Sequence, residues 1–139
     1  MKTKLTCSAI LALAASFGAA AQSPVTAGCL QELAFEPRLS IIANKVDVVH
    51  AAAHSQAPDR VATAEERAAV GLWLHLRNEC FEFGAAQRRA AYKPQDNAFT
   101  RAMFVFEQRL VAELQRGRVT YAEFNRRRLE LVEAAGEEL

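Results

Sequence analysis

The sequence predicts an all-α protein, a small bundle of about four helices that ends in a helical hairpin over residues 97–135. Three observations lead to this fold class. Apolar residues recur at spacings of three and four, two segments carry a Thr-x-x-Glu capping pattern, and no run alternates apolar with polar residues as a strand does.

A secretory leader opens the chain. Lys2 and Lys4 precede a charge-free apolar run that ends at three consecutive alanines. This pattern is typical of a signal peptide, and we expect cleavage after Ala21. Retention of the run as a membrane anchor is the alternative. We interpret residues 1–21 as the signal peptide and residues 22–139 as a single helical domain without a membrane span, located in the periplasm or secreted.

The mature chain is close to neutral. The full sequence has 17 Lys and Arg against 16 Asp and Glu, so loss of Lys2 and Lys4 with the leader leaves 15 against 16, a net charge of −1. Domains that bind nucleic acid usually carry a basic surplus, so this composition argues against nucleic acid as a partner.

Two cysteines remain after removal of the leader. In an oxidising compartment we expect Cys29 and Cys80 to form a disulfide that restricts the unfolded chain. The alternative is a lipid anchor on Cys29, because Ala27-Gly28-Cys29 is similar to the end of a lipoprotein processing motif.

The first two helices are expected on either side of Pro58. The first starts near Pro37, and its apolar stripe consists of Leu39, Ile42, Val46, Val49 and Ala53. The second starts at Thr63, where Thr63 and Glu66 match a capping box, and carries apolar residues on more than one face through Phe83. This pattern predicts a central position for the second helix.

The third helix follows the break at Pro94. Asp96 or Asn97 is expected to cap it, and Gly117 is expected to end it. Its predicted apolar stripe consists of Phe99, Met103, Phe106, Leu110 and Leu114.

The last helix is expected to begin behind Thr120 and Glu123, which repeat the capping pattern, and to fray around Gly136. Three consecutive arginines follow its start, and helix geometry gives them different positions.

Arg128 falls on the inner stripe of the last helix, where its charged head needs an acid such as Glu107 or Glu113. Arg126 points almost opposite and Arg127 lies on the flank. The run is therefore interpreted as one structural arginine beside two solvated neighbours, rather than as a single basic patch.

Eleven positions of the last two helices follow one motif: Leu110, Leu114, Gly117, Val119, Thr120, Glu123, Phe124, Arg127, Arg128, Leu131 and Val132. In these positions, residues 110–132 resemble the short C-terminal domain family called SHOCT. The resemblance implies a non-enzymatic two-helix hairpin that mediates oligomerisation, with Gly117, Thr120, Glu123, Phe124 and Arg128 as structural positions. The overall layout is also similar to that of secreted helical proteins of proteobacteria.

One group of side chains suggests a metal site. His50 and His54 lie one helical turn apart on the first predicted helix, and Asp47 lies one turn before them. Such a half-site suits zinc, nickel or copper, whereas the alternative is a set of polar residues that border the core.

The sequence contains no Gly-rich phosphate loop, no nucleophile elbow and no cysteine placed as a nucleophile. We therefore expect no catalytic residues and no cofactor. The leading hypothesis is an exported, non-enzymatic helical protein that acts through a protein partner or as a homo-oligomer, including self-association through residues 97–135. The alternative is a small periplasmic sensor or binding protein for a metal ion or an apolar ligand.

Overall fold

The computed structural model describes residues 23–51 and 57–137. Within these residues every regular element is helical, which confirms the predicted fold class. The elements are α1 (Pro24–Glu32), the 3₁₀ turns η1 (Leu33–Phe35) and η2 (Pro37–Leu39), α2 (Ala64–Phe83), α3 (Ala85–Ala91), α4 (Pro94–Gln115) and α5 (Tyr121–Glu137). No described helix has both the length and the apolar character that a membrane span needs. The predicted signal peptide lies outside the described residues.

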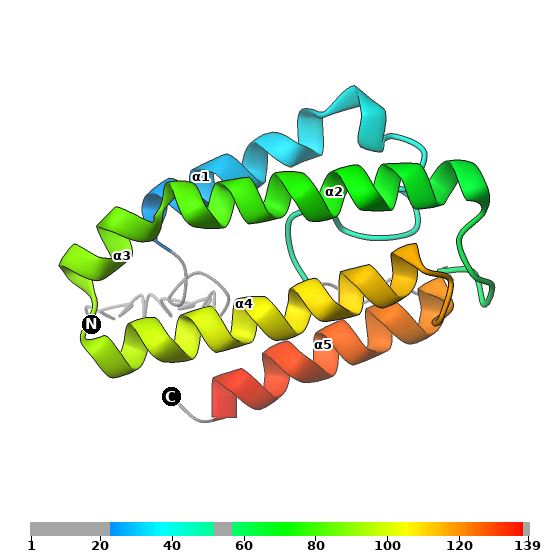
Figure 1. Ribbon diagram of the computed structural model, residues 1–139. Coiled ribbons are helices and arrows are strands. Elements are labelled where there is room, and N and C mark those ends of the chain that lie inside the picture. Colours follow the sequence, from blue (N-terminus) through cyan, green and yellow to red (C-terminus); the bar gives the residue numbers. More distant parts are fainter. Residues whose placement is uncertain (1–22, 52–56, 138–139) are drawn as a thin grey trace, which may run out of the picture.

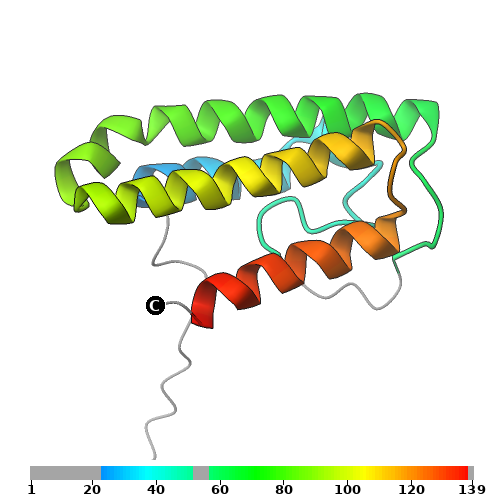
Figure 2. The same ribbon diagram turned by 60° about the horizontal axis from the view of Figure 1, so that its bottom comes forward.

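The bundle is organised around α2. α1 packs along one flank of α2, and α4 runs antiparallel along the other (Figure 1). The short helix α3 follows α2 and leads the chain round into α4, and α5 returns antiparallel to α4. Figure 2 shows α5 set apart from the layer of α2 and α4, with the segment 40–51 between α5 and α2.

The sequence prediction did not include α1, although Ser23 and Pro24 form a common helix start. Ser23 Oγ accepts the N–H of Thr26 at 3.2 Å, and Pro24 occupies the first turn. Ser23 and Thr26 are buried against the end of α2, where a Cβ on Gly84 would lie 1.9 Å from Thr26 Oγ1. Gly84 is thus required for the close approach of α1, and Arg88 Nη1 completes the junction by donating to Thr26 Oγ1 at 2.8 Å.

A disulfide joins α1 to α2. Cys29 and Cys80 are bonded across 51 positions of sequence, with their Cα atoms 5.3 Å apart, as the sequence analysis predicted. A sulfur atom that is bonded to Cys80 cannot also carry a lipid thioether. The structure therefore supports the disulfide rather than the alternative of a lipid anchor on Cys29.

The helix predicted from near Pro37 to before Pro58 does not form in residues 40–51. η2 ends at Leu39, and the described chain after it, residues 40–51, forms turns and bends. Leu39, Ile42 and Val46 are nevertheless fully buried. The apolar spacing identified core positions correctly, but it did not identify the backbone that presents them.

Hydrogen bonds from other elements hold the segment 40–51 in its irregular path. Three of its carbonyls accept from side chains of α2 and α5: Val48 from Trp73 (2.9 Å), Lys45 from Asn125 (2.8 Å) and Asp47 from Arg128. A helix would use these carbonyls for its own N–H groups, so the tertiary donors compete with helix formation. Asp47 Oδ1 competes as well, because it accepts the N–H groups of Val49 and His50 at 2.8 Å each.

α2 begins where the sequence predicts. Thr63 Oγ1 accepts the N–H of Glu66 at 3.3 Å, and the Glu66 carboxylate accepts the N–H of Thr63 at 2.8 Å, which confirms the capping box. Arg60 donates two further hydrogen bonds to this carboxylate, at 2.7 and 2.8 Å. The Arg60 bonds above all hold the pKa of Glu66 well below its ordinary value.

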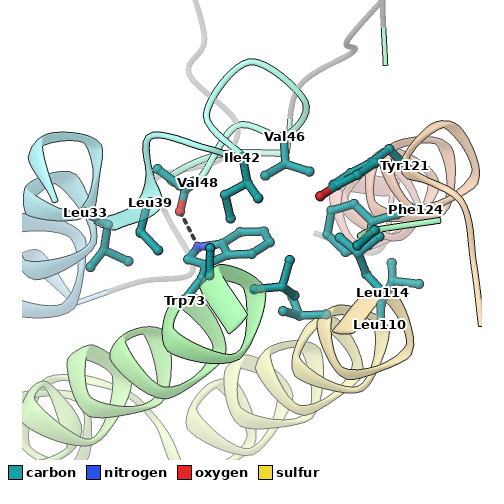
Figure 3. Packing of buried hydrophobic residues seen from close by; sticks show 14 of the residues in the cluster. Leu33, Leu39, Ile42, Val46, Val48, Trp73, Leu110, Leu114, Tyr121 and Phe124 are labelled. Carbon is teal, nitrogen blue, oxygen red and sulfur yellow. Dashed lines mark hydrogen bonds between the residues drawn. The ribbon is translucent and has the colours of Figure 1, made fainter. Parts of the chain in front are cut away.

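Trp73 lies at the centre of the core. Its side chain is fully buried, and its ring meets Phe124 edge-on with 5.9 Å between centroids. Apolar residues of every other layer surround it (Figure 3): Leu33, Leu39, Ile42, Val46, Val48, Leu110, Leu114 and Tyr121.

The start of α4 differs from the prediction. Lys93 is the N-cap and Pro94 the first helical residue, so neither Asp96 nor Asn97 caps the helix. Asp96 lies in the first turn, where its charge favours the positive end of the helix dipole.

The inner face of α4 is also rotated from the predicted stripe. The buried residues are Thr100, Phe104, Leu110, Val111 and Leu114, and Phe106 is 53% exposed. This buried face follows helical spacings of four and three, through positions 100, 104, 107, 111 and 114. Its middle position is the charged residue Glu107. A count of apolar residues missed this face because it treated Glu107 as a surface position.

The hairpin between α4 and α5 has the predicted stop and cap. Gly117 has a φ of 68°, which glycine adopts without strain. Thr120 Oγ1 accepts the N–H of Glu123 at 3.2 Å at the start of α5. α5 ends at Glu137, one residue after Gly136, around which the sequence analysis expected its end.

Candidate functional site

A charged cluster lies inside the bundle, where α2, α4 and α5 meet. The Glu107 carboxylate of α4 accepts from Arg77 of α2 at 2.5 Å and from Arg128 of α5 at 2.6 Å. The side chains of Arg77 and Arg128 are only 1% and 2% exposed, and that of Glu107 is 15% exposed. One carboxylate thus links three helices through two buried guanidinium groups.

Aromatic rings supply part of the surroundings of these guanidinium groups. The Arg77 and Arg128 Cζ atoms lie 5.5 and 5.4 Å from the centroid of the Trp73 ring. Such cation–π contacts favour a buried cation. Arg77 also donates through Nε to Gln108 at 3.2 Å, and Arg128 donates to the Asp47 carbonyl.

The electrostatics keep Glu107 ionised. Burial by itself raises the pKa of Glu107, but the nearby charges of Arg77 and Arg128 outweigh burial and hold that pKa below its ordinary value. Burial lowers the pKa of Arg77, which Glu107 opposes. A carboxylate held in this way is poorly suited to exchange protons with a substrate, so the cluster is a structural link.

Helix geometry predicted the different positions of Arg126 and Arg128 correctly. Arg128 is buried against Glu107, one of the two acids expected as its partner. Glu113, the other candidate, lies 3.3 Å from Arg127 instead. Arg126 is exposed and bonds Glu130, one turn further along α5, at 2.7 Å.

The residues of the predicted metal half-site are only partly described. His54 lies outside the described residues, and Asp47 Oδ2 is 4.0 Å from His50 Nδ1. The other oxygen of Asp47 accepts two backbone N–H groups. Among residues 23–51 and 57–137, no group of three or more His, Cys, Asp or Glu side chains is arranged to hold a metal ion.

A second feature lies on the surface, between α2 and α4. It is an open groove of about 500 Å³ with an apolar floor that includes Leu74, Phe81 and Phe104. The rings of Phe81 and Phe104 stack with 3.9 Å between centroids and 7° between planes. We call this feature the α2–α4 groove.

The rim of the α2–α4 groove is basic. Four arginines line it, with two glutamates: Arg101, Arg109, Arg116, Arg118, Glu82 and Glu113. Because Glu113 also pairs with Arg127, its charge is partly neutralised. The groove therefore combines apolar surface with a surplus of exposed positive charge.

The sequence analysis found only the Arg128–Glu107 half of the buried cluster and did not find the groove, although a signal for the groove was present. Arg101, Val105, Arg109, Ala112 and Arg116 share one face of α4 at helical spacings. That face lies away from the buried one and mixes arginine with small or apolar residues. The buried cluster has a weaker signal, because only the fold shows that Arg77 of α2 meets Glu107.

No protein-family model matches this chain, and neither curated proteins nor solved structures provide a match. The resemblance of residues 110–132 to SHOCT therefore stays a prediction. The functional argument depends on the geometry of the chain itself, in which one charged site is closed and the other is open to a partner.

Proposed function

We propose that this protein is an exported, non-enzymatic helical protein that acts through protein–protein contact, and that the α2–α4 groove is its contact surface. The observation that carries the proposal is the pairing of an apolar floor with an arginine rim in one open groove of about 500 Å³. The partner that fits this chemistry is an acidic, amphipathic protein segment.

Each part of the groove supports a different part of binding. Burial of the exposed apolar lining, such as Val105 (39% exposed), contributes free energy, because apolar area leaves water. The rim arginines add charge complementarity, which increases the association rate and disfavours basic partners. Arginine is also enriched in the residues that dominate binding energy at protein interfaces.

The buried charges support a non-enzymatic role. Arg77, Glu107 and Arg128 form a buried charged group, yet they connect helices and are largely closed to solvent. The exposed arginines of the groove are suited to recognition.

The proposal of export depends on the leader pattern in residues 1–21 and on the disulfide. Disulfides between structural cysteines are typical of periplasmic and secreted proteins. The periplasm or the exterior of the cell is therefore the proposed location.

Binding of a model partner tests the proposed contact surface. The probe is a labelled synthetic peptide of Glu and Leu, with Leu at helical spacings of three and four, measured by fluorescence anisotropy against the oxidised mature protein. We expect saturable binding that weakens with salt, and loss of at least about tenfold in affinity for Arg109→Glu.

Arg126→Glu is the matched control for this experiment. It makes the same change in charge at an exposed arginine of α5, outside the groove. We expect it to retain binding. Equal weakening by both substitutions would show a nonspecific charge effect and would overturn the groove as the contact surface.

A small apolar ligand is the second candidate occupant. The volume of the groove, about 500 Å³, lies within the range of roughly 300–1,000 Å³ that is common for small-molecule sites. An apolar dye that binds equally well to the native protein and to Arg109→Glu would favour this candidate, because such a ligand does not need the arginine rim.

A further inference from the structure

We propose that the partner of the α2–α4 groove is a second copy of this chain. The second copy contacts the groove through an acidic surface that lies on the opposite flank of its own α2. This inference rests on the proposed function, because it names the partner of the same groove. The contact joins two different surfaces, so copies associate head to tail.

The acidic surface surrounds the disulfide. It is a shallow hollow of about 300 Å³ whose charged lining residues are Glu32, Glu36 and Glu79, all acidic. Glu36 forms an ion pair with Arg38 at 2.7 Å, and Glu79 lies 3.2 Å from His75. Even with Arg38 at its border, the surface has a negative surplus. We call it the acidic face.

An exposed aromatic side chain projects from the acidic face. Phe35, in η1, is 81% exposed and lines the hollow beside Leu33 and Pro37. Large aromatic residues in a charged border are typical anchors of protein interfaces. The more accessible apolar lining of the groove, which includes Leu74 and Val105, is a chemically matched site for this ring.

The two surfaces lie on opposite flanks of α2. Leu74, Asn78 and Phe81 face the groove, whereas Leu76 and Glu79 face the acidic hollow. At about 100° per residue, these two sets point roughly 160° apart around the helix. Figure 1 shows the same arrangement, with α4 and α1 on either side of α2. One copy can therefore use both surfaces at the same time.

Charge complementarity selects this partner. The groove has four arginines and two glutamates among its lining residues, and the acidic face has three glutamates. The mature chain has a net charge of only −1 by its composition. A nearly neutral molecule therefore carries both a basic and an acidic surface. Two like surfaces would repel each other, whereas the two unlike surfaces attract.

A head-to-tail contact continues from copy to copy until it closes into a ring or remains an open chain. Both hollows are small, so the contact belongs with weak interfaces rather than obligate ones. We expect association that depends on protein concentration and decreases with salt.

The test uses two variants of the oxidised mature chain, each with one surface disabled. In the first variant, Arg101→Glu and Arg109→Glu disable the groove. In the second, Glu32→Gln, Phe35→Ala and Glu79→Gln disable the acidic face without making it basic. Near-ultraviolet circular dichroism and thermal melts verify that both variants are folded.

Sedimentation velocity then reports assembly from ~10 µM to ~1 mM protein, the range in which weak contacts associate. We expect the native chain to exceed the dimer mass at low salt and to return to monomer at ~0.5 M salt. Each variant alone should remain monomeric. An equimolar mixture should form dimers and nothing larger, because only one surface of each copy is still active.

The alternatives give different results. A native chain that remains monomeric throughout, yet binds the acidic peptide, overturns self-association and leaves the proposed function in place. A chain that shows neither assembly nor peptide binding overturns both. A mixture that stays monomeric while the native chain assembles also overturns this pairing of surfaces. Arg126→Glu, outside both surfaces, should assemble as the native chain does.

Discussion

The two faces of α4 use the same kinds of charged residue for different purposes. On the inner face, Glu107 holds Arg77 and Arg128 in a cluster that is nearly closed to water. On the outer face, Arg101 and Arg109 border the α2–α4 groove and are exposed to solvent. Burial, rather than residue type, decides which arginine stabilises the fold and which remains exposed to solvent.

The physical reason is the cost of removing a charge from water. A buried charge whose partner is lost has no solvent to replace it, so each member of the inner cluster depends on the others. An exposed arginine is solvated with or without a partner, and its pairs contribute little to stability. Substitutions on the two faces should therefore change different measurements.

The largest effect is expected from Glu107→Gln, which leaves two buried guanidinium groups without their shared anion. The free energy of unfolding should decrease by about 3 to 5 kcal/mol, as measured in urea melts. Glu113→Gln is the control, because it removes a more exposed carboxylate of the same helix and should cost no more than about 1 kcal/mol. Equal unfolding midpoints for the two variants would contradict the difference between the faces.

A smaller effect is expected from Arg128→Ala. The remaining Arg77 still pairs with Glu107, but the Asp47 carbonyl loses its donor and Trp73 loses a contact. We expect a loss of roughly 1 to 3 kcal/mol. Arg126→Ala should change stability by no more than about 0.5 kcal/mol. If both variants unfold at the native midpoint, Arg128 does not have the structural role assigned to it.

The pH dependence of stability tests the role of the buried Glu107 in a second way. The pKa of Glu107 in the folded protein lies below its ordinary value of 4.5, so its stabilisation is fully present above that value and is lost as pH falls through the folded pKa. The stability difference between the native protein and Glu107→Gln should therefore narrow below about pH 4.5. Urea midpoints between neutral and acidic pH measure this, and a constant difference would exclude Glu107 as a source of the acid sensitivity.

The smallest effect on stability is expected from Arg109→Ser on the outer face. Its free energy of unfolding should stay within about 0.5 kcal/mol of the native value, because this arginine is exposed and Phe106, which it contacts, is also exposed. Binding of the acidic peptide should nevertheless weaken and lose part of its salt dependence. Strong destabilisation without a change in binding would reverse the roles of the two faces.

Local signals in the sequence determined the helix ends and several side-chain positions of this protein. The capping box at Thr63 and Glu66, the stop at Gly117 and the inward position of Arg128 all follow from short-range geometry, and the structure has each of them. The disulfide was also predicted, because only Cys29 and Cys80 lie outside the proposed leader. These features depend on chemistry within a few residues or on a simple count.

Tertiary contacts decided the rest. Residues 40–51 have the apolar spacing of a helix, but side chains of α2 and α5 take the carbonyls that a helix would use. The sequence named Glu107 as one possible partner of Arg128, but only the fold shows that Arg77, 30 positions before Glu107, also meets it. The α2–α4 groove likewise exists only because two helices pack side by side. The sequence by itself predicts elements whose hydrogen bonds lie within a few residues of one another. Where a polar group bonds a residue far away in the sequence, only the tertiary structure decides the local conformation.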